Sequence, residues 1–150
     1  MERTLVLVKP DGVQRGLAGE IISRLERRGL KIAGMKMTQM DEAMAGRHYA
    51  VHEGKPFFKD LVDFITSSPI IAVVFEGPNA VQTVRSTMGQ TDPAKSPSGS
   101  IRGDLAIEMQ HNLIHGSDSV ENASKEISLF FAPHEVMAYT REIDRWVIGS

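Results

Sequence analysis

Two short apolar runs constrain what this chain can fold into more than any other feature. Residues 4–8 and 69–75 are continuous, rich in β-branched side chains, and flanked by charged or turn-forming residues. Runs of this length without polar alternation are typical of strands that are buried on both faces. The sequence therefore predicts a central sheet with other elements packed against it.

Helical patterns fill the gaps between these strands. From Leu17 the apolar residues recur at helical spacing up to Gly29, which stops the helix, and residues 31–39 alternate as a second strand. The remaining predicted elements are helices over 42–52, 57–65, 80–88, 119–126 and 134–143, and a fourth strand over 127–131. Residues 89–112 show no period, and we expect them to form a long functional loop.

This order of elements predicts one fold class. A β-α-β unit, an inserted helical hairpin, a β-α unit, a long active-site loop and a last strand make two split βαβ units. We therefore expect an α+β, ferredoxin-like βαββαβ sandwich, in which helices lie on the faces of a four-stranded antiparallel sheet. The length of 150 residues suits a single domain over 1–150.

Composition excludes several classes of protein and site. The net charge of −2 excludes a broad basic surface for nucleic acid, and the absence of cysteine excludes disulfides and cysteine-based zinc sites. His48 and His52 are four residues apart on a predicted helix, but no third ligand is near them, so no structural metal is expected. The first residues do not resemble a signal peptide, and the longest apolar run, 70–75, is too short to span a membrane. We expect a soluble, cytoplasmic protein.

Residues 112–118, Asn-Leu-Ile-His-Gly-Ser-Asp, combine several features of a phosphate site. Gly116 follows His115, and we expect it to turn the backbone tightly and leave the imidazole open. Asp118 and Glu121 have the spacing of a capping box, and free N–H groups at a helix N-terminus favour anions. These features favour phosphate chemistry, although a histidine packed beneath a loop fits the same residues.

Phosphate binding would have to use side chains, because the chain has no Walker A sequence and no Rossmann glycine motif. Lys9 ends the first strand, and Arg85 lies on the helix that leads into the long loop. Thr91 and Arg102 lie within that loop. Two arginines near one anion can fork onto phosphate oxygens. The alternative for each cation is a solvated surface position.

Aromatic and acidic residues add candidates whose roles stay open. Helical spacing can bury only one of Phe57 and Phe58 well, so the other either completes the core or lies at a cleft edge and stacks on a base. Tyr49 fits the core or a position near the histidine. Glu126 either orients the imidazole or is solvated on its helix. Trp146 is expected to anchor on the body of the chain or on a neighbouring subunit.

The chain resembles a known family, the nucleoside diphosphate kinases. Residues 112–118 match the family's active-site pattern Asn-x-x-His-Gly-Ser-Asp, and residues 8–13 and 101–104 are similar to two further family segments. So are residues 48–49 and 55–58. The resemblance covers nearly the whole chain in order, and several independent motifs make it specific.

The resemblance implies a reaction and a set of residues. The γ-phosphoryl group of a nucleoside triphosphate, chiefly ATP, would pass to a nucleoside diphosphate by a ping-pong mechanism through phosphohistidine at His115. Mg²⁺ would be held mainly by the nucleotide phosphates, with no protein metal ligands. The implied catalytic residues are His115, Lys9, Tyr49, Asn112, Glu126 and Ser117. The implied substrate-binding residues are Lys9, His52, Phe57, Leu61, Arg85, Thr91, Arg102, Met109 and Asn112.

The resemblance also implies partners. Phe57 would stack on the base, with Met109 on its other face and Leu61 lining the cleft, and stacking accepts every base. The partners would be nucleoside di- and triphosphates and further copies of the chain, with a hexamer favoured over a tetramer, and neither a membrane nor a nucleic acid is required. The rival hypotheses are a non-catalytic ferredoxin-like ligand-binding module and a histidine phosphocarrier that acts on proteins. The exposed histidine argues against the first, and the base-stacking cleft argues against the second.

Overall fold

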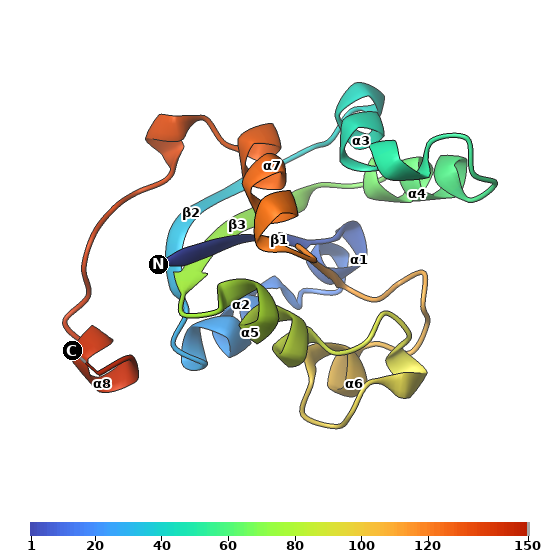
Figure 1. Cartoon of the computed structure of the whole chain (residues 1–150). Coiled ribbons are helices and arrows are strands. Elements are labelled where there is room, and N and C mark those ends of the chain that lie inside the picture. The colour runs from blue at the N-terminus through green and yellow to red at the C-terminus, as the bar shows by residue number, and fades with distance from the viewer. Residues whose placement is uncertain (150) are drawn as a thin grey trace.

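The computed structural model describes residues 1–149, which contain one four-stranded sheet. Its strands are β1 (Glu2–Val8), β2 (Lys31–Thr38), β3 (Ile70–Gly77) and β4 (Ile114–Gly116). All neighbouring strands are antiparallel, in the order β2-β3-β1-β4 (Figure 1). The two apolar runs thus form the central strands, and the predicted ferredoxin-like α+β fold is confirmed.

The helices around the sheet are short. They are α1 (Pro10–Gln14), α2 (Ala18–Arg27), α3 (Glu42–His48), α4 (Phe58–Ile65), α5 (Ala80–Met88), α6 (Ile101–Leu105), α7 (Val120–Phe130) and α8 (Asp144–Val147). Three 3₁₀ turns occur at Ala50–His52, Pro93–Lys95 and Pro133–Glu135. The longest helix, α7, has 11 residues, and within residues 1–149 no helix has the length and apolarity that a membrane span requires.

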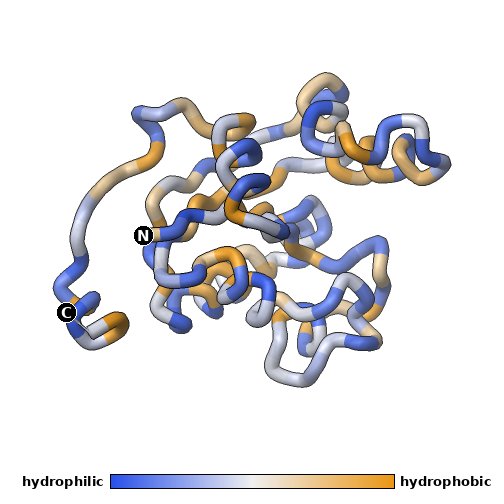
Figure 2. The backbone as a smooth tube through the Cα atoms, viewed as in Figure 1, coloured by the Kyte–Doolittle hydropathy of each residue, from blue (hydrophilic) through white to orange (hydrophobic). Residues whose placement is uncertain are grey.

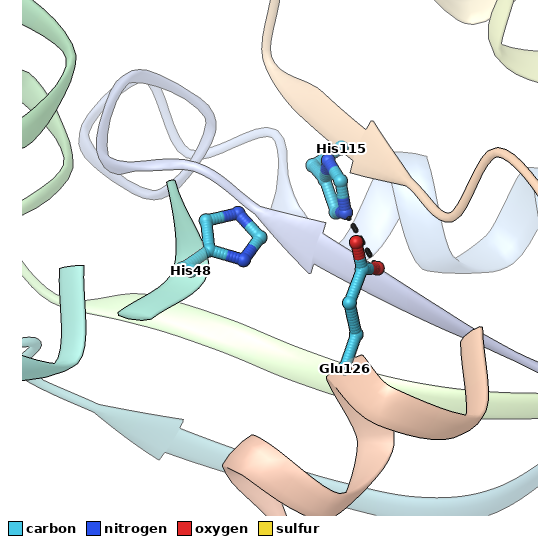
Figure 3. A group of neighbouring side chains, drawn as sticks. All are labelled: His48, His115 and Glu126. Atoms are coloured by element: carbon cyan, nitrogen blue, oxygen red, sulfur yellow. Dashed lines mark hydrogen bonds and ion pairs between the residues drawn. The ribbon is translucent and has the colours of Figure 1, made fainter. Parts of the chain in front are cut away.

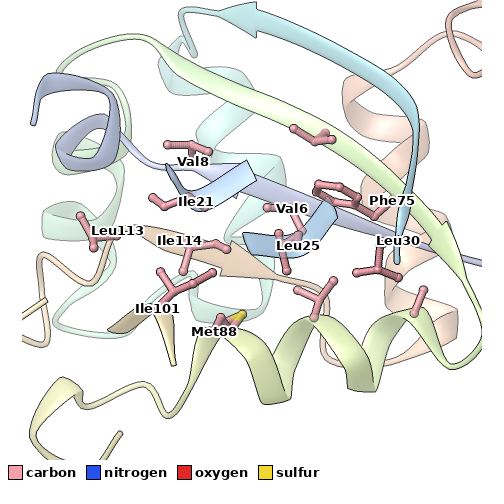
Figure 4. Close-up of a cluster of buried hydrophobic side chains, with 13 residues drawn as sticks. Val6, Val8, Ile21, Leu25, Leu30, Phe75, Met88, Ile101, Leu113 and Ile114 are labelled. Atoms are coloured by element: carbon pink, nitrogen blue, oxygen red, sulfur yellow. The ribbon is translucent and has the colours of Figure 1, made fainter. Parts of the chain in front are cut away.

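Each face of the sheet has its own core, because successive residues of a strand point to opposite faces. Val6 and Val8 pack with α2 and α5, as Figure 4 shows for this cluster. Leu5 and Leu7 pack on the other face with α3, α4 and α7. Figure 2 shows hydrophobic segments along the central strands, between the two helical layers. The sheet is therefore covered on both faces, as its apolar strands predict.

The predicted fourth strand over 127–131 is wrong. These residues form the end of α7 and the residue after it, whereas β4 lies in the segment predicted as loop and active site. Ile127, Phe130 and Phe131 have the i, i+3, i+4 spacing of a helical stripe and pack into the second core. A short apolar run fits a strand or a buried helix, and here the buried stripe decides for the helix.

The predicted last helix over 134–143 is also wrong. A 3₁₀ turn is followed by a segment without regular structure that passes along β2, and α8 forms only after it (Figure 1). Met137 N donates to Ala33 O at 2.7 Å, so contact with the edge strand replaces an intrahelical bond. Trp146 on α8 is 80 % exposed and therefore does not anchor on the body of its own chain.

Gly116 does not turn the backbone, contrary to the prediction. It lies within β4, paired with Val6 of β1. A Cβ at this position would lie 2.8 Å from the sulfur of Met88 and 3.0 Å from a methyl of Val84. Glycine is therefore required here for the close approach of β4 to α5.

Two local predictions about caps and loops are corrected as well. Ser119, rather than Asp118, caps α7, because its side chain accepts a hydrogen bond from Asn122 N at 3.0 Å. Residues 89–112 are not irregular throughout, since they include a 3₁₀ turn and α6. Ser100 caps α6 by accepting a hydrogen bond from Gly103 N at 3.0 Å.

Candidate active site

His115 lies in the middle of β4, and its ring points toward α7 (Figure 3). Its Nε2 is 2.9 Å from Oε1 of Glu126, and the Ser117 hydroxyl donates to the same oxygen at 2.7 Å. The His115 side chain is 27 % exposed. The ring is thus held by a carboxylate on one side and accessible on another, rather than packed beneath a loop.

The ionisation of Glu126 decides which nitrogen of His115 is free. Burial raises the pKa of the Glu126 carboxyl, but the hydrogen bond and charge of His115 and the Ser117 hydroxyl outweigh burial, so the pKa is lowered overall. An ionised carboxylate only accepts hydrogen bonds, so the neutral imidazole donates from Nε2. The lone pair of the ring then lies on Nδ1, which is the nucleophilic nitrogen.

The backbone just before β4 has an unusual conformation. Leu113 has φ of 74° and a fully buried side chain, and a non-glycine residue in this region is uncommon. Leu113 N donates to Asp11 Oδ2 at 3.0 Å, and Leu113 O accepts from Lys9 N at 2.9 Å. These bonds fix the direction in which the chain enters β4, and they join the end of β1 to the segment that carries His115.

A polar network lies at the end of β1. The Lys9 ammonium donates to the side-chain oxygen of Asn112, and Asn112 Nδ2 donates to Thr91 O at 2.9 Å. Burial lowers the pKa of Lys9 to about 8, against the opposing charge of Asp11 and with a further contribution from Arg102. Lys9 is therefore still mostly protonated at neutral pH, in a half-buried position where its charge is poorly screened.

Arg102 is 5 % exposed and donates to three backbone carbonyl groups. Its Nε donates to Asn112 O at 3.1 Å, Nη2 to Ile114 O at 2.5 Å, and Nη1 to Gly89 O at 3.3 Å. Burial and, after it, the nearby charge of Arg85 lower its pKa to about 10. A guanidinium has five N–H groups, so two remain for a ligand. Arg102 thus has a structural role that its sequence position did not indicate.

An aromatic chain runs from His115 to the surface. His48 contacts the His115 ring, with centroids 4.9 Å apart, and Tyr49, with centroids 4.6 Å apart. The ring centroids of Tyr49 and His52 are 6.3 Å apart, and those of His52 and Phe57 are 5.2 Å apart. Burial raises the pKa of Tyr49 to about 12, so its phenol keeps its proton. The sequence singled out Tyr49, His52 and Phe57 but gave no role to His48, the residue of this chain that contacts His115.

The two adjacent phenylalanines separate as their spacing predicts. Phe58 packs against the second core, whereas Phe57 is 46 % exposed. Leu61 is half-buried on α4, and Met109 is exposed on the turn between Glu108 and His111. The side chains of Thr91 and Arg85 are exposed. The structure therefore joins the candidates around His115 and Lys9 by direct contacts, and places Leu61, Met109 and Arg85 on the surrounding surface.

The comparisons with known proteins show the family to which the chain is related. A family model described as nucleoside diphosphate kinase matches residues 2–136. A nucleoside diphosphate kinase from Thermomicrobium roseum is 57 % identical over 99 % of this chain and 100 % of its own length. One from Dehalococcoides mccartyi is 61 % identical over 94 % of this chain and 99 % of its own length.

The comparison with solved structures finds the same fold in related proteins. A halophilic nucleoside diphosphate kinase from Halobacterium salinarum, in complex with CDP, has a TM-score of 0.95 at 51 % identity, covering 97 % of both chains. A nucleoside diphosphate kinase family protein from Babesia bovis has a TM-score of 0.95 at 43 % identity, covering 98 % of this chain and 99 % of the other. The chain therefore belongs to the nucleoside diphosphate kinase family, and its activity is that of this phosphotransferase.

Proposed function

We propose that Nδ1 of His115 attacks the γ-phosphorus of a nucleoside triphosphate in line. The new N–P bond forms as the bond from phosphorus to the leaving diphosphate oxygen breaks, and the reverse step hands the group to a second nucleoside diphosphate. The observation that carries this proposal is the bond between His115 Nε2 and Glu126 Oε1, at 2.9 Å. It fixes the tautomer that leaves a lone pair on Nδ1, and Ser117 in turn holds the carboxylate.

The cations near His115 are proposed to bind the phosphate chain. Lys9 carries a charge at neutral pH, Arg102 keeps two unused N–H groups, and Arg85 is exposed next to Arg102. Their charges stabilise the negative charge that spreads over the moving phosphoryl group. The Thr91 hydroxyl and the Asn112 amide are proposed to supply neutral donors.

Tyr49, His52 and Phe57 are proposed to line the approach to His115. A half-buried phenol with a pKa of about 12 remains a hydrogen-bond donor, so Tyr49 suits a phosphate oxygen. The exposed ring of Phe57 suits stacking on a base, with Leu61 and Met109 as further apolar contacts. The related Halobacterium salinarum enzyme was solved in complex with CDP, which supports a nucleotide as the ligand of this chain.

Mg²⁺ is proposed to arrive on the nucleotide phosphates. Mg²⁺ requires oxygen ligands in octahedral geometry. Glu126 accepts from the ring and from Ser117, one oxygen of Asp11 accepts from Leu113 N, and the neighbouring His48 and His115 offer nitrogen rather than oxygen. These residues do not fit a dedicated magnesium site, so no step of the mechanism passes through a protein-bound Mg²⁺.

We also propose assembly into a homo-oligomer, a hexamer rather than a tetramer. The support is an apolar C-terminal region that its own chain leaves uncovered: Trp146 is 80 % exposed, Ile143 53 % and Val147 42 %. Sedimentation of the intact chain measures the number of copies. A cytoplasmic location is proposed as well, and a chain without cysteine suits a reducing compartment.

One experiment tests the chemistry. The protein is incubated with ATP and Mg²⁺, freed of nucleotide, and analysed for an acid-labile phosphoryl group; GDP is then added and GTP is measured. We expect both products from the native chain and from His134→Ala, an exposed-histidine control, and neither from His115→Ala. A phosphoryl group that forms on His115→Ala, or one that GDP does not remove, contradicts the proposal.

A further inference from the structure

His48 contacts the His115 ring, and the proposed reaction does not use it. The two rings meet edge to face, with centroids 4.9 Å apart and an interplanar angle of 82°. On its other side His48 packs edge-on against Phe130, at 5.7 Å. Its Nδ1 is buried and finds no hydrogen-bond partner within residues 1–149. Most buried polar atoms are paired, so this nitrogen requires an explanation.

The unpaired ring completes a group of three possible metal ligands. One ligand atom each from His48, His115 and Glu126 lie within 4.8 Å of one another. They come from three elements that are separate in sequence, α3, β4 and α7, and their side chains converge on one point (Figure 3). Zinc binds imidazole and carboxylate at about 2.0–2.2 Å, which places tetrahedral ligands about 3.3 Å apart. Side-chain rotations that close the largest gap by about 1.5 Å would complete this geometry.

We propose that His48, His115 and Glu126 form a reversible site for a borderline-soft divalent cation such as Zn²⁺, and that the bound cation switches off the kinase. Two imidazoles and one carboxylate match a known set of zinc ligands, with water in the fourth position. The same set does not suit Mg²⁺, which prefers oxygen. The site is therefore distinct from the magnesium that accompanies the nucleotide.

A neutral imidazole has a single ring nitrogen with a free lone pair, and the inhibition follows from this. The inhibition, unlike the binding of the cation, rests on the proposed role of His115. Without the cation, Nε2 of His115 carries the hydrogen that Glu126 accepts, and Nδ1 carries the lone pair. A cation bound at Nε2 needs the lone pair there, so the proton moves to Nδ1. A protonated Nδ1 cannot attack phosphorus. The cation thus stops phosphoryl transfer by reversing the tautomer, even where the nucleotide cleft stays open.

The first test is direct binding of Zn²⁺ to the full chain without nucleotide, measured by titration calorimetry. We expect one Zn²⁺ per chain. Affinity should fall at least about tenfold in His48→Phe and in His48→Gln, a range known for residues that support a metal site. The exposed-histidine variant His134→Gln should bind as the native chain does. Circular dichroism checks that both His48 variants remain folded, and the two substitutions differ in size and polarity.

The second test reads the tautomer and the reaction. In the ¹⁵N spectrum of labelled imidazoles, Zn²⁺ should move the His115 proton from Nε2 to Nδ1. At a buffered free Zn²⁺ concentration, the rate of His115 phosphorylation by MgATP should fall in the native chain. The Zn²⁺ concentration that halves this rate should be at least about tenfold higher in His48→Phe, each protein being compared with its own zinc-free rate.

The outcomes separate this inference from the proposed function. Equal Zn²⁺ affinity in the native chain and both His48 variants, or loss of binding in His134→Gln, overturns the zinc site. Full phosphorylation of the zinc-loaded protein overturns the proposed inhibition. A zinc-free protein that is never phosphorylated at His115 overturns the proposed function, whereas the calorimetric result stands independently of it.

Discussion

Replacement of Arg102 by alanine should destabilise the fold as well as weaken phosphate binding. The side chain donates to the carbonyl oxygens of Asn112, Ile114 and Gly89, and thereby ties α6 to the segment before and within β4. A hydrogen bond from a charged donor contributes about 1.5–3 kcal/mol. Asn112 O also accepts from Ile114 N at 2.8 Å, so it keeps a partner in the variant. The loss therefore falls mainly on the other two carbonyl groups.

The cost of burying the charge opposes these bonds. The fall of the Arg102 pKa to about 10, caused first by burial, corresponds to roughly 3 kcal/mol against the charged form. Three charge-assisted bonds contribute about 4.5–9 kcal/mol, so the net loss on Arg102→Ala is about 1.5–6 kcal/mol in the free energy of unfolding. Because Asn112 O keeps a partner, we expect a value in the lower part of this range. Arg102→Lys should lose less, since an ammonium supplies donors but not the planar fork.

The assay is urea unfolding followed by far-ultraviolet circular dichroism, at one protomer concentration because the proposed assembly would contribute to stability. Arg85→Ala is the matched control: Arg85 is exposed, and its guanidinium makes no hydrogen bond within residues 1–149. Its free energy of unfolding should stay within about 0.5 kcal/mol of the native value. An Arg102→Ala variant as stable as Arg85→Ala, with an unchanged denaturant slope, would refute the structural role.

Three further predictions concern single side chains. Because burial lowers the pKa of Lys9 to about 8, Lys9 loses its charge as the pH rises through that value, and kcat/KM should therefore fall above about pH 8. Lys9→Gln should be slower than the native chain and should lack this alkaline fall. Tyr49, with a pKa of about 12, cannot cause the fall. Glu126→Ala should slow His115 phosphorylation by about 10²-fold in a rapid-quench experiment, because the ring loses the acceptor that fixes its tautomer, and an unchanged rate constant would contradict this. Gly116→Ala should cost about 1–3 kcal/mol of unfolding free energy, because its Cβ would meet Met88 and Val84. The control is Gly19→Ala on α2, where a Cβ meets no other atom, and this variant should be neutral or stabilising. Equal unfolding free energies for the two variants would show that β4 tolerates a side chain.

The central fold could be predicted because local pattern and tertiary burial agree there. The runs at 4–8 and 69–75 are apolar on both faces, and both faces are covered by helices. At 127–131 the pattern fits a strand and a helix equally, and only the position of the core decides for the helix. The helix predicted over 134–143 was wrong for a different reason. Its hydrogen bond to Ala33 depends on an edge strand 100 residues away, which no local pattern contains.

In the site, too, some positions could be predicted from local sequence and others could not. The positions of His115, Lys9 and Asn112 follow from a compact motif and from the end of a clear strand, and the structure joins Lys9 to Asn112 directly. The bonds of Arg102 could not be foreseen, because its carbonyl partners are brought to it by the left-handed conformation of Leu113 and by the packing of α6. His48 was set aside for lack of a third ligand in sequence, since its neighbours lie on other elements.

The wrong prediction at 127–131 bears on the chemistry through Glu126. If residues 127–131 formed a strand, the carboxylate would lie at a strand start and would not face β4. As a helix, α7 continues past Glu126, and the chain reverses after Gly116 so that Glu126 returns to the ring of His115. From Val120 to Glu126 the helix rises about 9 Å. The apolar residues at 127, 130 and 131 thus serve the reaction through packing: they hold α7 against Leu5 and Leu7, and with it the acceptor that leaves Nδ1 free.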